Sequence, residues 1–153
     1  MRLFVPIMVL GLLLAGCAHE MEGSSHKLPA CSGSLVKGCT LTVYFNFNSA
    51  MISPFGQKRL DWIYEKMTRW PKREVTITGY ADEVGSDAYN LELSRLRAIS
   101  AKLYLVNRGI EPGRINIDYK GTADSQCVDN VNCHGLDRRV VLKIKNKKIW
   151  GIF

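Results

Sequence analysis

The chain has 153 residues, a hydrophobic content of 46% and a charged content of 23%. This length allows one domain with a core of its own but not two, and the composition excludes a chain that is disordered along its bulk. The formal net charge of +7 suits anionic neighbours such as lipid headgroups, wall polymer or nucleic acid, without choosing among them.

The first 16 residues have the features of a signal peptide. A basic start at Arg2 precedes an apolar run, residues 3–14, that is too short to span a bilayer. The sequence Leu-Ala-Gly-Cys that ends at Cys17 resembles the lipobox of bacterial lipoproteins, which implies cleavage before Cys17 and lipid on that cysteine. An ordinary secretory signal is the alternative. Ala18, rather than aspartate, follows Cys17, and by analogy with enteric bacteria this favours the outer membrane.

Four further cysteines form an even set in a chain predicted to be exported, which indicates disulfides. The simplest pairing joins Cys31 to Cys39 and Cys127 to Cys133, because each bond closes a short loop. Pairing between the two segments stays open. We expect no metal site, because the nearby histidine is His134 and no CxxC spacing occurs.

The elements before the centre of the chain follow from local signals. Residues 17–40 lack a sustained period and predict a lipidated N-terminus and linker, and a flexible segment of about 23 residues has an r.m.s. reach of about 25–30 Å. Residues 41–47 predict a strand. Ser53 and Pro54 favour the start of a helix that stops at Pro71. Its apolar stripe consists of Leu60, Ile63, Tyr64, Met67 and Trp70.

The second half of the chain predicts a strand, a helix and two further strands. Residues 75–79 alternate as a strand and lead through an acidic loop, residues 81–87, into a helix from Ala88 to Arg108 that Gly109 ends. We expect its core face to consist of Leu93, Leu96, Ser100, Leu103 and Val106. Residues 114–119 and 138–145 predict two more strands, separated by a polar loop, residues 121–134, and residues 147–153 form an apolar tail.

The order β-α-β-α-β-β, with two amphipathic helices of similar length, predicts an α+β fold. In this two-layer sandwich both main helices cover one face of a mixed sheet.

One stretch also carries a candidate binding site. Asn90, Ser94 and Arg97 are spaced to share one helix face, and Asp82 precedes the start of that helix. A carboxylate and a guanidinium beside a helix N-terminus can hold both ends of a zwitterion, provided that both side chains reach it. The alternative is that Asp82 is a cap or a solvated charge and that Arg97 forms a surface ion pair.

The ordered string TGYADxxGSxxYNxxLSxxRA over residues 78–98, followed by NRGI and later by DRRV, resembles the OmpA C-terminal-like family of peptidoglycan-binding domains. Peptidoglycan-associated lipoproteins are members of that family, and the match covers roughly residues 42–144. The resemblance implies a domain over residues 41–146 that binds the meso-diaminopimelate of Gram-negative peptide stems.

The ligand contacts that the resemblance implies are Asp82, Asn90, Arg97 and Arg138, with Asn46 standing where the family usually has aspartate. Other positions also depart from the family pattern. Tyr80-Ala81 replaces His-Thr, and Asp137 replaces asparagine, which adds a carboxylate that we expect to compete with the ligand for the arginine.

Two functions fit these expectations. The first is a non-catalytic, lipid-anchored protein on the periplasmic face of the outer membrane that ties this membrane to peptidoglycan. The second is a structural lipoprotein subunit of an envelope machine, such as a type IV secretion core complex or a flagellar collar. The cysteine loop and the apolar tail motivate the second. An enzyme is the weakest interpretation, because Ser94 has no histidine in its segment and no motif for a cofactor occurs. The predicted compartment excludes nucleic acid as a partner.

Overall fold

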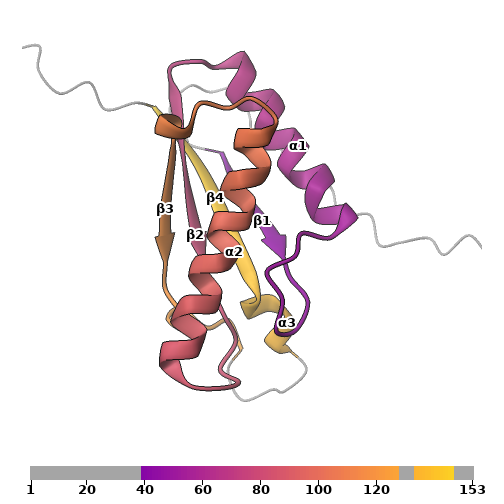
Figure 1. Ribbon diagram of the computed structural model, residues 1–153, viewed down its shortest axis with the longest axis vertical. Helices are drawn as coiled ribbons and strands as arrows, with labels where there is room; N and C mark the ends of the chain where they lie inside the picture. The colour runs from indigo at the N-terminus through magenta and orange to yellow at the C-terminus, as the bar shows by residue number, and fades with distance from the viewer. Residues whose placement is uncertain (1–38, 128–132, 147–153) are drawn as a thin grey trace, which may run out of the picture.

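The computed structural model describes residues 39–127 and 133–146, which form a four-stranded sheet with two long helices on one face (Figure 1). The elements are β1 (Thr40–Tyr44), α1 (Pro54–Arg69), β2 (Arg73–Gly79), α2 (Asp87–Asn107), the 3-10 turn η1 (Pro112–Arg114), β3 (Ile115–Tyr119), α3 (His134–Asp137) and β4 (Arg139–Asn146). The predicted α+β fold is confirmed. The short helical segments η1 and α3 were not predicted.

Several predictions concern segments that the structure does not describe. The signal peptide, the lipid on Cys17, the linker and the apolar tail all lie outside the described residues and stay predictions. None of the described helices combines the length and the apolar character that crossing a bilayer requires.

The strand order β1-β4-β2-β3 gathers several chain segments at one end of the sheet. β4 runs antiparallel to both β1 and β2, whereas β2 and β3 are parallel. The ends of β1, β2 and β3 therefore lie beside the start of β4. The loops that leave these strands meet α3 at this end, which is the lower end of the molecule in Figure 1.

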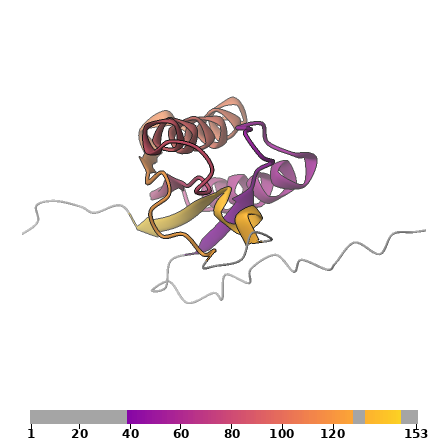
Figure 2. The same cartoon turned by 90° about the horizontal axis from the view of Figure 1, so that it is seen from below.

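The core lies between the sheet and the helices α1 and α2. In β4, Val140, Leu142 and Ile144 are fully buried, whereas Lys143 and Lys145 are exposed on the other face, as the alternation predicted. Inward-facing residues of all four strands form one cluster with apolar residues of both helices. Viewed from the lower end, both helices cover the same face of the sheet (Figure 2).

Capping residues fix where the long helices begin and end. The Ser53 hydroxyl accepts a hydrogen bond from the Gly56 N–H at 3.1 Å, and the Ser86 hydroxyl accepts one from the Tyr89 N–H at 3.3 Å. At the end of α2, Gly109 adopts a φ of +103° and donates its N–H to Val106 O at 2.8 Å. Both helices therefore lie within two residues of their predicted bounds.

The predicted core face of α2 was right for Leu93, which is buried, and for Val106, which packs partly buried against the core, but it was wrong at two positions. Leu96 and Leu103 are 41% and 54% exposed, and small side chains take their place against the sheet. The buried residues of α2 are Asn90, Leu93, Ser94, Arg97, Ala98, Ala101 and Leu105. The reason is a close approach at Gly79, where an added Cβ would lie 2.0 Å from Ser94 O. A helix this near to a strand has room only for small residues at the contact.

This contact predicts that Gly79→Ala is strongly destabilising. The new methyl group meets backbone atoms of α2, so the helix must shift, and we expect the free energy of unfolding to fall by about 3 kcal/mol or more. Urea unfolding measures the loss. Gly113→Ala is the matched control, because its Cβ would meet only the end of the Glu111 side chain at 3.6 Å. A similar small effect of both substitutions would contradict the close approach.

Candidate functional site

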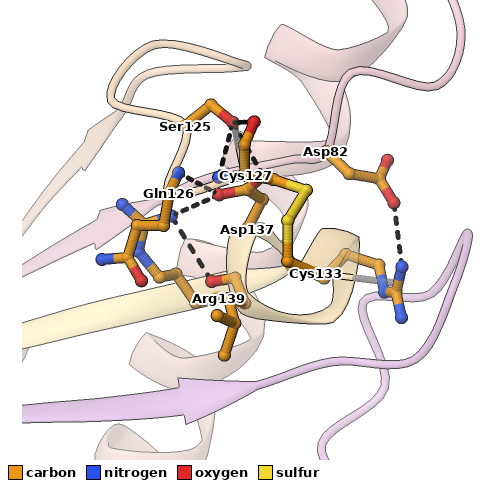
Figure 3. Close-up of a disulfide and its surroundings, with 9 residues drawn as sticks. Asp82, Ser125, Gln126, Cys127, Cys133, Asp137 and Arg139 are labelled. Atoms are coloured by element: carbon orange, nitrogen blue, oxygen red, sulfur yellow. Dashed lines mark hydrogen bonds and ion pairs between the residues drawn. A yellow bond between two sulfur atoms is a disulfide. The ribbon is translucent and has the colours of Figure 1, made fainter. Parts of the chain in front are cut away.

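The candidate site lies where the β1–α1 loop, the β2–α2 loop and α3 meet. Asp82 belongs to the β2–α2 loop and is 3% exposed. Its Oδ2 forms an ion pair with Arg138 Nη1 at 3.1 Å, and the side chain of Arg138 is 21% exposed. Arg138 also donates from Nε to Phe45 O at 3.3 Å. Figure 3 shows the Asp82 carboxylate directed at this guanidinium. The structure therefore brings together two of the predicted site residues as a direct pair.

Arg97 occupies a different place from the one that the sequence predicted. It is fully buried and donates hydrogen bonds to three backbone carbonyl groups, at 2.9 Å to Ser49 O, 2.9 Å to Tyr80 O and 3.3 Å to Asn46 O. The guanidinium has no surface through which a ligand can touch it. The expectation that Arg97 faces the ligand was therefore wrong, and its place is that of a cation that joins two loops to each other.

The charge of Arg97 persists in this environment. Burial is the main cause that lowers its pKa to about 10; the nearby Asp82 carboxylate acts in the opposite direction, and Arg138 lowers the pKa further. A pKa of about 10 still leaves the guanidinium protonated at neutral pH. Three carbonyl dipoles, rather than an anion in direct contact, stabilise the buried charge.

The remaining predicted residues divide between the interior and the surface. Asn90 is 1% exposed, and neither polar atom of its side chain has a hydrogen-bond partner among the described residues. It lies beneath the turn at Gly85, whose φ is +108°. The Ser94 hydroxyl donates to Leu91 O at 2.7 Å and accepts from Gly121 N at 3.0 Å, so it is a structural link. Asn46 is exposed, and its backbone carbonyl, as described above, binds Arg97.

A pocket of about 210 Å³ opens beside the ion pair. Its lining residues come from both loops and the start of α2 and are Phe47, Asn48, Asp82, Val84, Gly85, Tyr89 and Leu93. The Tyr89 hydroxyl donates to the Asn48 side chain across the opening. One carboxylate in a mostly apolar wall fits a ligand with a cationic group on an aliphatic chain. Sequence reasoning found Asp82 but missed the apolar lining, because Phe47 and Val84 lie in loops without periodicity.

Asp137 also differs from its predicted role. It is fully buried and points away from Arg138, toward the loop that follows β3 (Figure 3). Its carboxylate accepts hydrogen bonds from Gln126 N at 2.6 Å and from Ser125 Oγ at 2.8 Å, and it pairs with Arg139 Nη1 at 3.4 Å. The expected competition between Asp137 and a ligand for Arg138 is therefore absent from this structure. Asp137 instead fixes the segment that carries Arg138.

A disulfide between Cys127 and Cys133 closes the same segment. The other predicted disulfide, Cys31–Cys39, involves a residue outside the described part of the chain and stays a prediction.

Cys127, His134 and Asp137 place three possible metal ligands within 4.8 Å of one another. The sulfur is already bonded, however, and the guanidinium of Arg139 lies against the carboxylate. This donor set does not fit a metal ion while the disulfide is intact.

Comparison with known proteins agrees with this fold. The model of the OmpA family matches residues 44–132. Outer membrane protein A of Shimwellia blattae is 39% identical over 116 residues, which cover 67% of this chain and 48% of that protein. The peptidoglycan-associated lipoprotein from Burkholderia pseudomallei has a TM-score of 0.65 and 25% identity, over 68% of this chain and 89% of that one. The OmpA-like domain of FopA1 from Francisella tularensis shares the fold with a TM-score of 0.61 and 20% identity, over 71% and 75% of the two chains.

The described residues therefore define an OmpA-like α+β domain. The chain belongs to the OmpA family, as the sequence resemblance predicted. It spans about a third to a half of the length of the curated relatives that it matches, with 34% and 48% of two of them covered.

The network around Asp137 predicts a large effect of Asp137→Ala. The substitution leaves the buried guanidinium of Arg139 without its anion, so we expect the free energy of unfolding to fall by about 3–5 kcal/mol. Asp118→Ala is the control, because Asp118 and Lys120 form an exposed pair at 3.8 Å and such a pair contributes less than about 1 kcal/mol. Urea unfolding compares the two, and equal losses would contradict the buried role of Asp137.

Proposed function

We propose that the protein is a non-catalytic outer-membrane lipoprotein whose OmpA-like domain binds the diaminopimelate stem of peptidoglycan and ties the membrane to the cell wall. The observation that carries this proposal is the Asp82–Arg138 pair beside a mostly apolar pocket. The side-chain end of an uncross-linked diaminopimelate carries an ammonium and a carboxylate on a short aliphatic chain. A carboxylate and a guanidinium held next to each other match both charges of such a ligand.

The residues take distinct roles in this proposal. Asp82 accepts the ammonium, Arg138 donates to the carboxylate, and the ligand replaces the internal ion pair with two intermolecular ones. The aliphatic part lies against the pocket wall, where Phe47 and Val84 are 61% and 49% exposed. Arg97 acts as a positioning residue, because it holds the carbonyl groups of both loops that carry these contacts.

The path of the chain supports a tethering role. β1 begins at the end of the sheet opposite the site, because it runs toward Phe45, whose N–H bonds to Arg138 O at 2.8 Å. A lipid on Cys17 would therefore hold the domain by one end and leave the pocket at the other. Likeness to a solved protein named as a peptidoglycan-associated lipoprotein supports the same wall-binding role.

The proposal predicts that Asp82→Asn and Arg138→Gln each weaken retention by purified diaminopimelate-type sacculi. Charge-assisted hydrogen bonds contribute about 1.5–3 kcal/mol each, so binding of one stem should fall about 10- to 150-fold. Sacculus pulldown and titration with a soluble stem peptide measure the loss. Arg95→Gln is the control, because Arg95 pairs with Glu92 on the outside of α2. Equal retention of all these variants would overturn the proposed site.

The stem peptides themselves sharpen this test. A stem with lysine in place of diaminopimelate keeps the ammonium but lacks the carboxylate that Arg138 would bind. We therefore expect the lysine stem to compete poorly with the diaminopimelate stem for the wild-type protein. We also expect its affinity to differ little between the wild type and Arg138→Gln. Arg97→Ala is not a clean test, because loss of the buried guanidinium leaves three carbonyl groups unpaired and disturbs both loops.

A structural subunit of an envelope machine, such as a type IV secretion core complex or a flagellar collar, is the second candidate. The disulfide between Cys127 and Cys133 motivates it, because this bond lies just before α3, at the same end of the sheet as the pocket. Deletion of residues 149–153, the predicted apolar tail, followed by co-purification of neighbouring envelope proteins, separates assembly from simple tethering. The two functions are compatible, since such machines also require attachment to the cell wall.

A further inference from the structure

One side of α1 carries a stripe of aromatic and basic residues at the border of the core. Trp62 and Trp70 are partly buried against the core, and the rest of each ring reaches the surface. We call the stripe the α1 flank, and its members are Phe55, Arg59, Trp62, Lys66, Arg69 and Trp70. Successive members are one, three or four residues apart, so they share a single side of the helix. The buried residues Leu60, Ile63 and Met67 face the sheet from a neighbouring side.

Two cations of the α1 flank, Arg59 and Lys66, lie against its own aromatic rings. Arg59 stands 5.7 Å from the centroid of Phe55 and Lys66 stands 5.1 Å from that of Trp62. Just beyond the helix, Arg73 stands 4.0 Å from the centroid of Trp70. Among the described residues no acidic side chain forms an ion pair with Arg59, Lys66 or Arg69. These positive charges are therefore available to an external anion.

The acidic residues of α1 do not cancel this charge. Asp61 is turned toward α2, where it pairs with Arg108 at 2.8 Å and accepts from the Tyr104 hydroxyl at 2.7 Å. Glu65 borders the flank, and no other acid occurs between residues 54 and 73. The same span holds six basic residues, namely Lys58, Arg59, Lys66, Arg69, Lys72 and Arg73.

The α1 flank also has a defined place in the molecule. Arg59 Nε donates to Thr42 O at 2.6 Å, which sets the flank beside β1, an outer strand of the sheet (Figure 1). α1 runs away from the pocket, so Arg69 and Trp70 lie at the end of the sheet where β1 begins. The predicted linker to Cys17 enters the domain at this same end.

We infer that the α1 flank binds an anionic lipid surface. Basic side chains supply the attraction to acidic headgroups, and half-buried tryptophans suit the boundary between headgroups and acyl chains. The inference rests on the proposed lipid anchor for its biological setting, since the anchor would hold this end of the domain near a membrane. Contact with the lipid would orient the domain with α1 against the membrane and the pocket still exposed.

The test is co-sedimentation with vesicles of phosphatidylcholine, with and without about 30% phosphatidylglycerol. The protein is the chain without residues 1–16 and with Cys17→Ser, so that no acyl chain contributes and all described residues are kept. We expect binding to the anionic vesicles only, and loss of that binding at about 0.5 M salt because surface charges are screened. Binding to neither vesicle, or to both equally, would overturn the inference.

A pair of double variants locates the surface. Lys66→Glu with Arg69→Glu should weaken vesicle binding at least about 25-fold, since each basic residue near an anionic surface contributes about fivefold. Arg95→Glu with Lys120→Glu changes the net charge equally at the opposite edge of the sheet and should keep most of the binding. An equal loss of vesicle binding in both double variants would show that binding depends on net charge and not on the α1 flank, which would overturn the inference.

Sacculus retention by the same variants separates this inference from the proposed function. We expect Lys66→Glu with Arg69→Glu to bind sacculi like wild type, because neither residue lies at the pocket. If this variant keeps vesicle binding and loses sacculi instead, the α1 flank serves the wall polymer and the lipid assignment is wrong. If Asp82→Asn is retained by sacculi as well as the wild type is, the proposed pocket is wrong, but the result with vesicles is unaffected.

Discussion

The buried guanidinium of Arg97 is the interaction on which the site depends. The β1–α1 and β2–α2 loops turn carbonyl groups inward, and a desolvated carbonyl without a donor costs free energy comparable to a lost hydrogen bond. Arg97 satisfies one carbonyl from the second loop, at Tyr80, and two from the first. A single side chain therefore fixes the two loops relative to each other, and the pocket between them takes its shape from this link.

The position of Arg97 depends in turn on how closely α2 approaches the sheet. Gly79 lets the backbone of α2 at Ser94 lie against the end of β2, and Arg97 follows one turn later. A larger residue at position 79 would lift the helix and move the guanidinium from its carbonyl partners. Arg138 is fixed by different means, because its neighbours Asp137 and Arg139 form their own buried pair facing the β3–α3 segment. The contacts of Arg97 with the loop carbonyl groups and the Asp137–Arg139 pair therefore have no charged group in common.

Hydrophobic periodicity was sufficient to predict the order of the main elements and the α+β class, because strand alternation and helix caps are local properties. For the core face of α2 it placed Leu93 correctly but failed at Leu96 and Leu103, because a helical period of 3.6 fits both these exposed leucines and the residues that are buried instead. Only the distance between helix and sheet decides between them, and that distance is set by Gly79, which carries no hydrophobic signal.

The site illustrates the same limit for charged residues. Sequence spacing correctly placed Asp82 near the start of α2, but it gave no means to tell a ligand-binding arginine from one that bonds loop carbonyls. Asp137 and Arg138 are adjacent in sequence, yet their side chains point to different parts of the structure because backbone direction changes at the end of α3. Burial and partner geometry, rather than residue type, assign the roles of these groups.

The arrangement of β1 and β4 has a consequence for a protein that is pulled between a membrane and a wall. Under the proposed function, force enters at the start of β1 and leaves at the opposite end of the sheet, through Asp82 and through Arg138, which lies just before β4. The two strands are antiparallel and joined over five residue pairs, from Thr40↔Lys143 to Tyr44↔Arg139. Because the bonds between strands are perpendicular to the strand direction, a pull along β1 loads all of these pairs together rather than one after another. The tether and the site at opposite ends of one ladder thus make the sheet itself the element that resists the load.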